Sequence, residues 1–190
     1  MASPVEEKRV PGDLAMWCFI LAELAVFGVF FLAYGVARRQ APALFAAGQA
    51  RLHLAPALFN TLLLIAGSAT AAAAVRAFSA NRQRAGRWLL AATLGSGCVF
   101  VVVKLGEFAE RLKAGITLST DTFWMFYLSL TFFHFLHVLL GMVILAAVWW
   151  MAGDGRYRPG SLDGVETAAA YWHMVDLVWV VLFALVYVAR

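Results

Sequence analysis

Five long apolar segments dominate this sequence, and they constrain its fold more than any other feature. A helix needs about 20 mostly apolar residues to cross the hydrocarbon core of a bilayer. Segments of at least that length occupy residues 14–37, 57–78, 86–112, 123–152 and 165–189. None has the short alternating pattern of a membrane β-strand. The sequence therefore predicts an all-α fold: an integral membrane bundle of five transmembrane helices, forming a single domain over residues 1–190.

The composition excludes the water-soluble classes of protein. The chain has 190 residues, of which 63% are hydrophobic and 14% charged, whereas a soluble domain is about 25% charged. A soluble domain of this length still exposes roughly 30% of the surface of its unfolded chain, so it could not hide so much apolar surface. The net charge of +4 does not indicate a nucleic-acid partner, because the basic residues lie mainly between the apolar segments, where they mark membrane topology.

The distribution of basic residues also indicates an orientation. Connections on the cytoplasmic side of a membrane are enriched in Lys and Arg. The side of the N-terminus carries eight such residues against six on the other side, and its densest cluster is Arg76, Arg82, Arg84 and Arg87. The first segment is too long for a signal-peptide core, and its flank at residues 6–9 is mixed in charge, so we expect it to be retained. The N-terminus is predicted to be cytoplasmic and the C-terminus outside.

A few polar side chains lie inside the apolar segments, where a charge costs about 2.5–3.5 kcal/mol and calls for a partner or a role. We expect Glu23 to be a buried carboxyl group with no cation near it on its own helix. The other polar side chains inside the segments are expected to form an interhelical polar network: Asn60, Glu107, His134, His137, Trp172, His173 and Asp176.

Helical spacing suggests particular contacts within this network. Asp176 is within reach of His173 and of the indole of Trp172, and we expect it to bond to one of them. Lys104 precedes Glu107 by three residues, which allows an ion pair. We expect His134 and His137 to form interhelical hydrogen bonds.

Several functions are compatible with these residues taken alone. A rigid, non-catalytic bundle needs only that the polar groups satisfy one another. A small membrane cytochrome b could ligate one haem through His173 and either His134 or His137. A stand-alone proton or ion transporter could use Glu23 and Asp176, although no Pro interrupts any span. Cys18 and Cys98 lie singly inside spans, and we expect no metal site.

Two segments carry a more specific pattern. Residues 171–179, Tyr-Trp-His-Met-Val-Asp-Leu-Val-Trp, and residues 134–141, His-Phe-Leu-His-Val-Leu-Leu-Gly, resemble the signatures of subunit III of the haem–copper oxidases. Ala22 with Glu23, and the run at residues 60–64, resemble the same family's preceding helices. The matches fall in order in four of the five spans. Phe135 departs from the pattern, because it replaces a Gly common between the paired histidines.

The resemblance implies a non-catalytic accessory subunit that packs against a haem-bearing catalytic subunit in the bacterial inner (cytoplasmic) membrane. Family subunit III carries neither haem nor copper, so the expected cofactor is none, apart from structural phospholipid. The resemblance also implies support of assembly, stability and sustained proton uptake, with Glu23 as the proton-related group. The mitochondrial form has seven helices, and this chain would correspond to the last five.

Other details resemble one branch of the family, the five-helix subunit-III-like proteins encoded beside bacterial nitric oxide reductases. They are residues 42–45 with Gln49, Lys104 with Glu107, and the ending at residues 171–190. The five-helix subunit III of quinol and cytochrome c oxidases is the rival branch.

Overall fold

The computed structural model describes residues 13–189, so the flank at residues 6–9 and Arg190 lie outside the described residues. Six helices and a terminal π-helical turn make up the described chain: α1 Leu14–Gln40, α2 Pro42–Ala50, α3 Leu54–Ser79, α4 Gln83–Lys113, α5 Thr122–Gly153, α6 Asp163–Phe183 and η1 Ala184–Val188. Five spans are long and apolar enough to cross a membrane: α1, α3, α4, α5 and α6 together with η1. The predicted all-α membrane bundle is confirmed.

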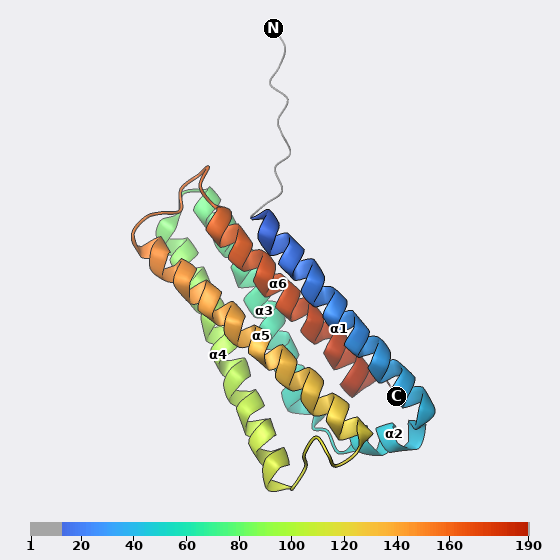
Figure 1. Ribbon diagram of the computed structural model, residues 1–190. Helices are drawn as coiled ribbons and strands as arrows, with labels where there is room; N and C mark the ends of the chain where they lie inside the picture. Colours follow the sequence, from blue (N-terminus) through green and yellow to red (C-terminus); the bar gives the residue numbers. More distant parts are fainter. Residues whose placement is uncertain (1–12, 190) are drawn as a thin grey trace.

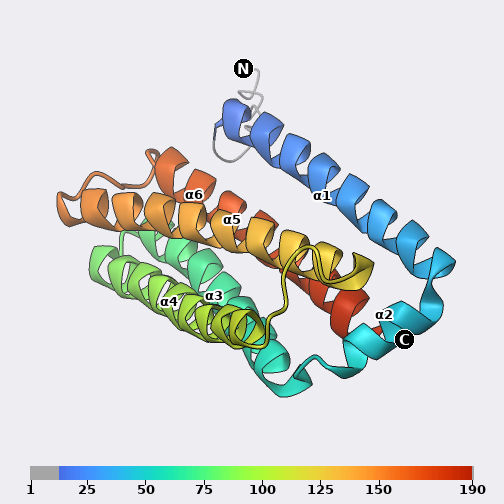
Figure 2. The same ribbon diagram turned by 60° about the horizontal axis from the view of Figure 1, so that its bottom comes forward.

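The five long helices run up and down side by side in three layers (Figures 1 and 2). α3 and α4 form one layer, α5 and α6 lie in the middle, and α1 covers α5 and α6 from the other side. The most extensive contact joins α3 to α4. The small residues of α3 permit it, because a Cβ on Gly67 would overlap the side chain of Ser96 on α4.

α1 touches the rest of the bundle along a narrow line. Its buried residues are Ile20, Phe27 and Tyr34, each seven positions after the last. Residues at this spacing lie on one face of a helix. The rest of α1 is largely exposed, and that exposed surface is apolar, as expected of a face in contact with lipid or another subunit.

The short helix α2 lies between the first two predicted spans, at residues to which the sequence assigned no helix. Pro42 stands at the start of the helix, where its fixed φ favours the first turn and its missing N–H costs nothing. Phe45 of α2 is buried, and its ring packs against Tyr34 at 5.1 Å and Phe123 at 5.6 Å between centroids. The amide of Gln49 donates to the carbonyl groups of Val186 and Ala189. α2 therefore closes one end of the bundle and anchors the end of α6.

Candidate functional site

The carboxyl group of Glu23 on α1 meets the imidazole of His137 on α5. Oε2 of Glu23 lies 3.0 Å from Nε2 of His137, and the two side chains are 19% and 10% exposed. The other imidazole nitrogen, Nδ1, donates to the carbonyl oxygen of Phe133 at 2.8 Å. Glu23 is thus partly rather than fully buried, and its partner comes from a helix distant in sequence.

The two bonds of His137 determine how many protons the pair holds. Nδ1 must carry a proton, because a carbonyl oxygen can only accept a hydrogen bond. The 3.0 Å contact between Nε2 and the Glu23 carboxyl then needs one more proton, carried either by the carboxyl group or by the imidazole. Without it, a carboxylate would face a nitrogen lone pair. The contact between the two side chains therefore needs one shared proton, in addition to the proton on Nδ1.

Aromatic rings enclose this pair on the protein side. The rings of Phe27 and Phe133 lie 5.2 and 4.8 Å from the His137 ring, both near edge-to-face. Tyr171 packs against Phe19 of α1, and its hydroxyl donates to the backbone carbonyl of His137 at 3.4 Å. These contacts fix the imidazole while leaving part of the Glu23 side chain accessible.

His134 forms a separate interhelical bond. Its Nε2 donates to the carbonyl oxygen of Val175 on α6 at 3.0 Å. Its ring is fully buried against Phe100 and Trp179, and within the described chain its Nδ1 has no hydrogen-bond partner. His134 and His137 therefore bond to different helices and do not converge on one point.

The contacts of His173 and Asp176 correct part of the expected network. Nδ1 of His173 bonds to the Ser68 hydroxyl on α3 and lies 3.6 Å from Oδ2 of Asp176, beyond ordinary hydrogen-bond length. Of the two partners expected for Asp176, His173 lies within ion-pair distance, whereas the indole nitrogen of Trp172 has no hydrogen-bond partner among residues 13–189. The fully buried Trp172 ring instead fills the space beside Gly97 and Gly141 at the centre of the bundle.

Asn60 also departs from expectation. It is fully buried on α3, yet neither its amide nitrogen nor its amide oxygen has a hydrogen-bond partner in the part of the chain that the structure describes. The neighbouring Thr61 makes the interhelical contact instead, since its hydroxyl accepts from Nε1 of Trp179 at 2.9 Å and donates to the carbonyl of Ala57. Thr61 and Trp179 lie far apart in sequence, so helical spacing alone could not reveal their contact.

Lys104 and Glu107 form the most buried ion pair. Nζ of Lys104 donates to Oε2 of Glu107 at 2.6 Å and to the hydroxyl of Tyr187 at 3.3 Å, and it lies 4.7 Å from the centroid of the Trp179 ring. The Tyr187 hydroxyl lies 3.1 Å from that of Tyr127. The spacing of Lys104 and Glu107 anticipated the pair, but the contribution of Tyr127 and Tyr187 depends on how α5 and the end of α6 pack.

No group of three or more His, Cys, Asp or Glu side chains that could hold a metal ion occurs among the described residues. The site residues instead form three separate centres: Glu23 with His137, Ser68 with His173, and the cluster around Lys104. The fold and these centres define a class of protein, a membrane protein with five candidate spans and polar contacts between its helices.

The comparisons with known proteins identify the family. Residues 11–189 match the family cytochrome c oxidase subunit III. Cytochrome c oxidase subunit 3 of Synechocystis is 36% identical over 184 residues, covering 92% of this chain and 76% of that protein. Its counterpart in Thermostichus vulcanus is 32% identical and covers 92% and 86%. The probable quinol oxidase subunit 3 of Staphylococcus epidermidis is 27% identical and covers 98% and 94%.

The chain belongs to the cytochrome c oxidase subunit III family of the haem–copper oxidases. It is therefore a multi-pass membrane protein and an accessory subunit of an oxidase-type complex, associated with a catalytic subunit. Membership of this family favours an accessory subunit over the stand-alone transporter and the small cytochrome b that the polar residues alone left open.

Proposed function

We propose that this chain is a non-catalytic accessory subunit that keeps proton uptake by its catalytic partner going during turnover, and that the Glu23–His137 pair is the group responsible. The observation that carries the proposal is the 3.0 Å contact between Oε2 of Glu23 and Nε2 of His137, whose Nδ1 is held by Phe133. Such a contact holds one proton, and its partial exposure lets that proton exchange with a neighbour.

The position of the pair suits this role. Glu23 lies near the middle of α1, the helix with the largest exposed apolar face. Glu23 itself lies between the buried residues Ile20 and Phe27, and its 19% exposed side chain can still meet lipid or a second subunit at the edge of that buried line. Intramembrane ionisable groups commonly serve proton transfer. A catalytic subunit or a structural phospholipid packed against α1 would thus lie beside the shared proton.

The other polar centres support assembly and stability in this proposal. The hydrogen bond from Lys104 on α4 to Tyr187 in η1 and that from Trp179 on α6 to Thr61 on α3 each tie helices together inside the bundle. We place the subunit in the bacterial cytoplasmic membrane, with the N-terminus on the cytoplasmic side, on the basis of its basic residues.

A substitution of Glu23 tests the proton role. In the purified complex, Glu23→Gln should leave the initial electron-transfer rate per haem near the wild-type value. It should lower the number of turnovers before inactivation several-fold, because the shared proton is lost. His137→Gln should have the same effect. Asp154→Asn, which removes an exposed carboxylate from the connection after α5, is the matched control. Wild-type turnover lifetimes in both Glu23→Gln and His137→Gln would reduce the pair to a packing contact.

A nitric oxide reductase is the second candidate partner. The residues behind that resemblance gather around the end of α6, where Gln49 binds the carbonyl groups of Val186 and Ala189, and Lys104 binds both Glu107 and Tyr187. The complex that co-purifies with the tagged subunit decides the matter. Reduction of nitric oxide but not of oxygen by that complex would favour the reductase, and the reverse would favour an oxidase.

A further inference from the structure

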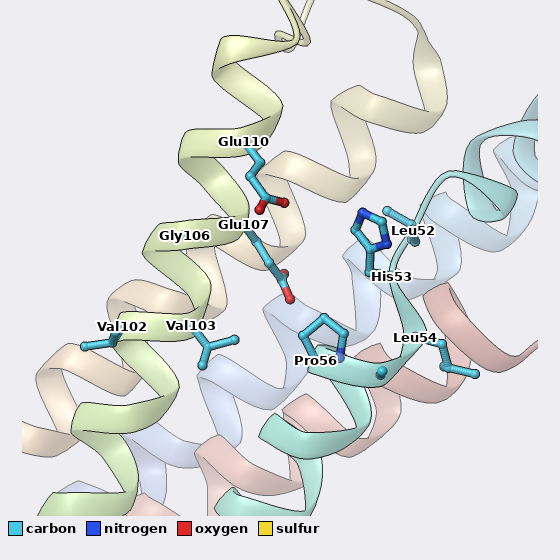
Figure 3. A pocket seen from close by; sticks show the side chains of 10 residues that line it. Leu52, His53, Leu54, Pro56, Val102, Val103, Gly106, Glu107 and Glu110 are labelled. Atoms are coloured by element: carbon cyan, nitrogen blue, oxygen red, sulfur yellow. The ribbon is translucent and has the colours of Figure 1, made fainter.

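A pocket of about 540 Å³ lies where α6 is flanked by α1 on one side and α3 on the other. It is distinct from the pocket between the start of α3 and the last turns of α4, which Figure 3 shows. Three of its lining residues are alanines, Ala72 on α3 and Ala169 and Ala170 on α6, whose small side chains leave the space open. Its volume is in the range of small-molecule sites.

The pocket extends from the membrane surface deep into the hydrocarbon. One end is lined by Arg76 in the last turn of α3 and by Glu166 in the first turn of α6. The other end is lined by His173, which lies about 15 Å along α6 from its first residue, Asp163. The hydrocarbon core is about 30 Å thick, so His173 lies close to its middle.

His173 brings a polar atom without a partner to this depth. Its side chain is 44% exposed. Both of its polar contacts within residues 13–189 are made by Nδ1, to the Ser68 hydroxyl and toward Asp176, which leaves Nε2 unbonded in the described chain. A polar group that faces hydrocarbon cannot bond to water, so leaving it unpaired is costly. We therefore expect the occupant of the pocket to supply a hydrogen-bond partner.

The contact with Ser68 lets Nε2 act either as a donor or as an acceptor. A serine hydroxyl can donate to Nδ1 or accept from it, and a neutral imidazole carries one proton. If Ser68 donates, the imidazole proton is on Nε2, which can donate to a carbonyl oxygen. If Ser68 accepts, the proton is on Nδ1, on the side of Asp176, and Nε2 can accept from a hydroxyl group.

We propose that this pocket reversibly binds a membrane quinone, a flat uncharged ring with two oxygen substituents and an apolar tail. The carbonyl oxygen of the oxidised form would accept from Nε2 of His173, and the hydroxyl group of the reduced form would donate to it. The side chain of Leu177, which is 53% exposed, borders the pocket and offers the tail an apolar path into the lipid.

The chemistry separates a quinone from other occupants. An acyl chain has no hydrogen-bonding group at this depth and would leave Nε2 unpaired, and a charged ligand is costly near the middle of the membrane. A polar side chain of a second subunit could bond to His173 but would fill only part of the pocket. The proposal concerns binding alone, and the site shares no residue with the Glu23–His137 pair.

The test is quinone binding by the full-length chain in nanodiscs, with empty nanodiscs as the blank. Decylubiquinone and a short-tailed menaquinone are the probes, and quenching of tryptophan fluorescence is the readout. At least one probe should bind saturably, and an excess of decylbenzene, which has an apolar tail but no oxygen, should not displace it. His173→Phe keeps a flat ring but removes the nitrogen, and should weaken binding several-fold, as expected of one hydrogen bond.

Two alanines of α3 provide a matched pair of variants. Ala72 lines the pocket, whereas Ala66 is exposed elsewhere on the same helix. Ala72→Leu fills the pocket and should abolish saturable binding, and Ala66→Leu should retain it. Circular dichroism of both variants checks that the helices are intact.

Three results would overturn the proposal. The first is the absence of saturable binding of either quinone by the wild-type chain. The second is wild-type affinity in both His173→Phe and Ala72→Leu. The third is binding by the isolated chain that Ala72→Leu does not alter in the purified complex, which would assign the pocket to a side chain of the partner. None of these results bears on turnover in Glu23→Gln, so this proposal and the proton proposal fail separately.

Discussion

At the scale of single residues, the polar contacts of this protein compensate ionisable groups that lie in apolar surroundings. Lys104 is fully buried and is compensated by Glu107, the Tyr187 hydroxyl and the face of Trp179. Glu23 is compensated by His137. The first pair could be predicted from a spacing of three residues along one helix. The second pair joins two residues on different helices, 114 positions apart in the sequence, so no local pattern could predict it.

The buried ion pair should be strongly asymmetric in its response to mutation. Glu107→Gln leaves the Lys104 ammonium buried without a counter-charge, and should lower the free energy of unfolding by about 3–5 kcal/mol. The double variant Lys104→Met/Glu107→Gln removes both charges and should recover most of that loss. Thermal unfolding of the two variants in the same detergent checks this, and a double variant as unstable as the single one would contradict it.

At the scale of helices, apolar segments determined the spans well, because a bilayer demands a minimum length of apolar helix. Their ends were less predictable. α1 continues to Gln40 past the apolar residues, because polar residues can prolong a helix beyond the hydrocarbon. α3 begins at Leu54, so that Pro56 falls in its first turn, where a proline is tolerated. The sequence did not predict α2, because its nine residues are too few to span a membrane and because its N-cap, Ala41, makes no side-chain capping bond. Pro42 was the one available signal.

The packing of α2 depends on a glycine. A Cβ on Gly48 would overlap the ring of Phe123, which is itself fully buried. Gly48→Ala should therefore destabilise the protein by about 1–3 kcal/mol, although alanine is the better helix former. Gly28→Ala, where a Cβ meets nothing within 4 Å, should be neutral or slightly stabilising. Melting temperatures of the two variants make the comparison, and equal values would show that α2 is not held as described.

A buried side-chain hydrogen bond from Trp179 to Thr61 contributes to the contact between α6 and α3, in addition to the bond between Ser68 and His173. Trp179→Phe removes the donor to Thr61 and should cost about 1–3 kcal/mol, the penalty for an unpaired buried polar group. Trp88→Phe, at a tryptophan that is 78% exposed, should have little effect. Chemical unfolding of both variants followed by fluorescence provides the measurement, and similar losses would argue against a specific role for the Trp179 indole.

At the scale of the whole molecule, an odd number of spans puts the two ends of the described chain on opposite faces of the membrane (Figure 1). The sequence predicted this number of spans, and the family motifs predicted a haem-bearing catalytic subunit as the partner. The contacts that distinguish the Glu23 centre from the Lys104 centre appear only when α1, α5 and α6 are assembled.

The orientation can be tested by labelling. In a background with Cys18 and Cys98 replaced by alanine, Ser79→Cys lies at the end of α3 and Ser119→Cys in the connection before α5, and both positions are exposed. A membrane-impermeant thiol reagent should reach Ser119→Cys in intact cells and Ser79→Cys only after the membrane is opened. The reverse pattern would contradict a cytoplasmic N-terminus.

The central claim is that this chain works as an accessory subunit of a haem-bearing complex and holds no redox centre of its own. Its most direct test is the absorbance spectrum of the tagged chain purified from membranes in mild detergent, before and after the complex is dissociated. Haem bands should accompany a second polypeptide and leave with it, so that the isolated chain is colourless. A Soret band that stays with the isolated chain would contradict it, as would purification of the chain without any haem-bearing partner.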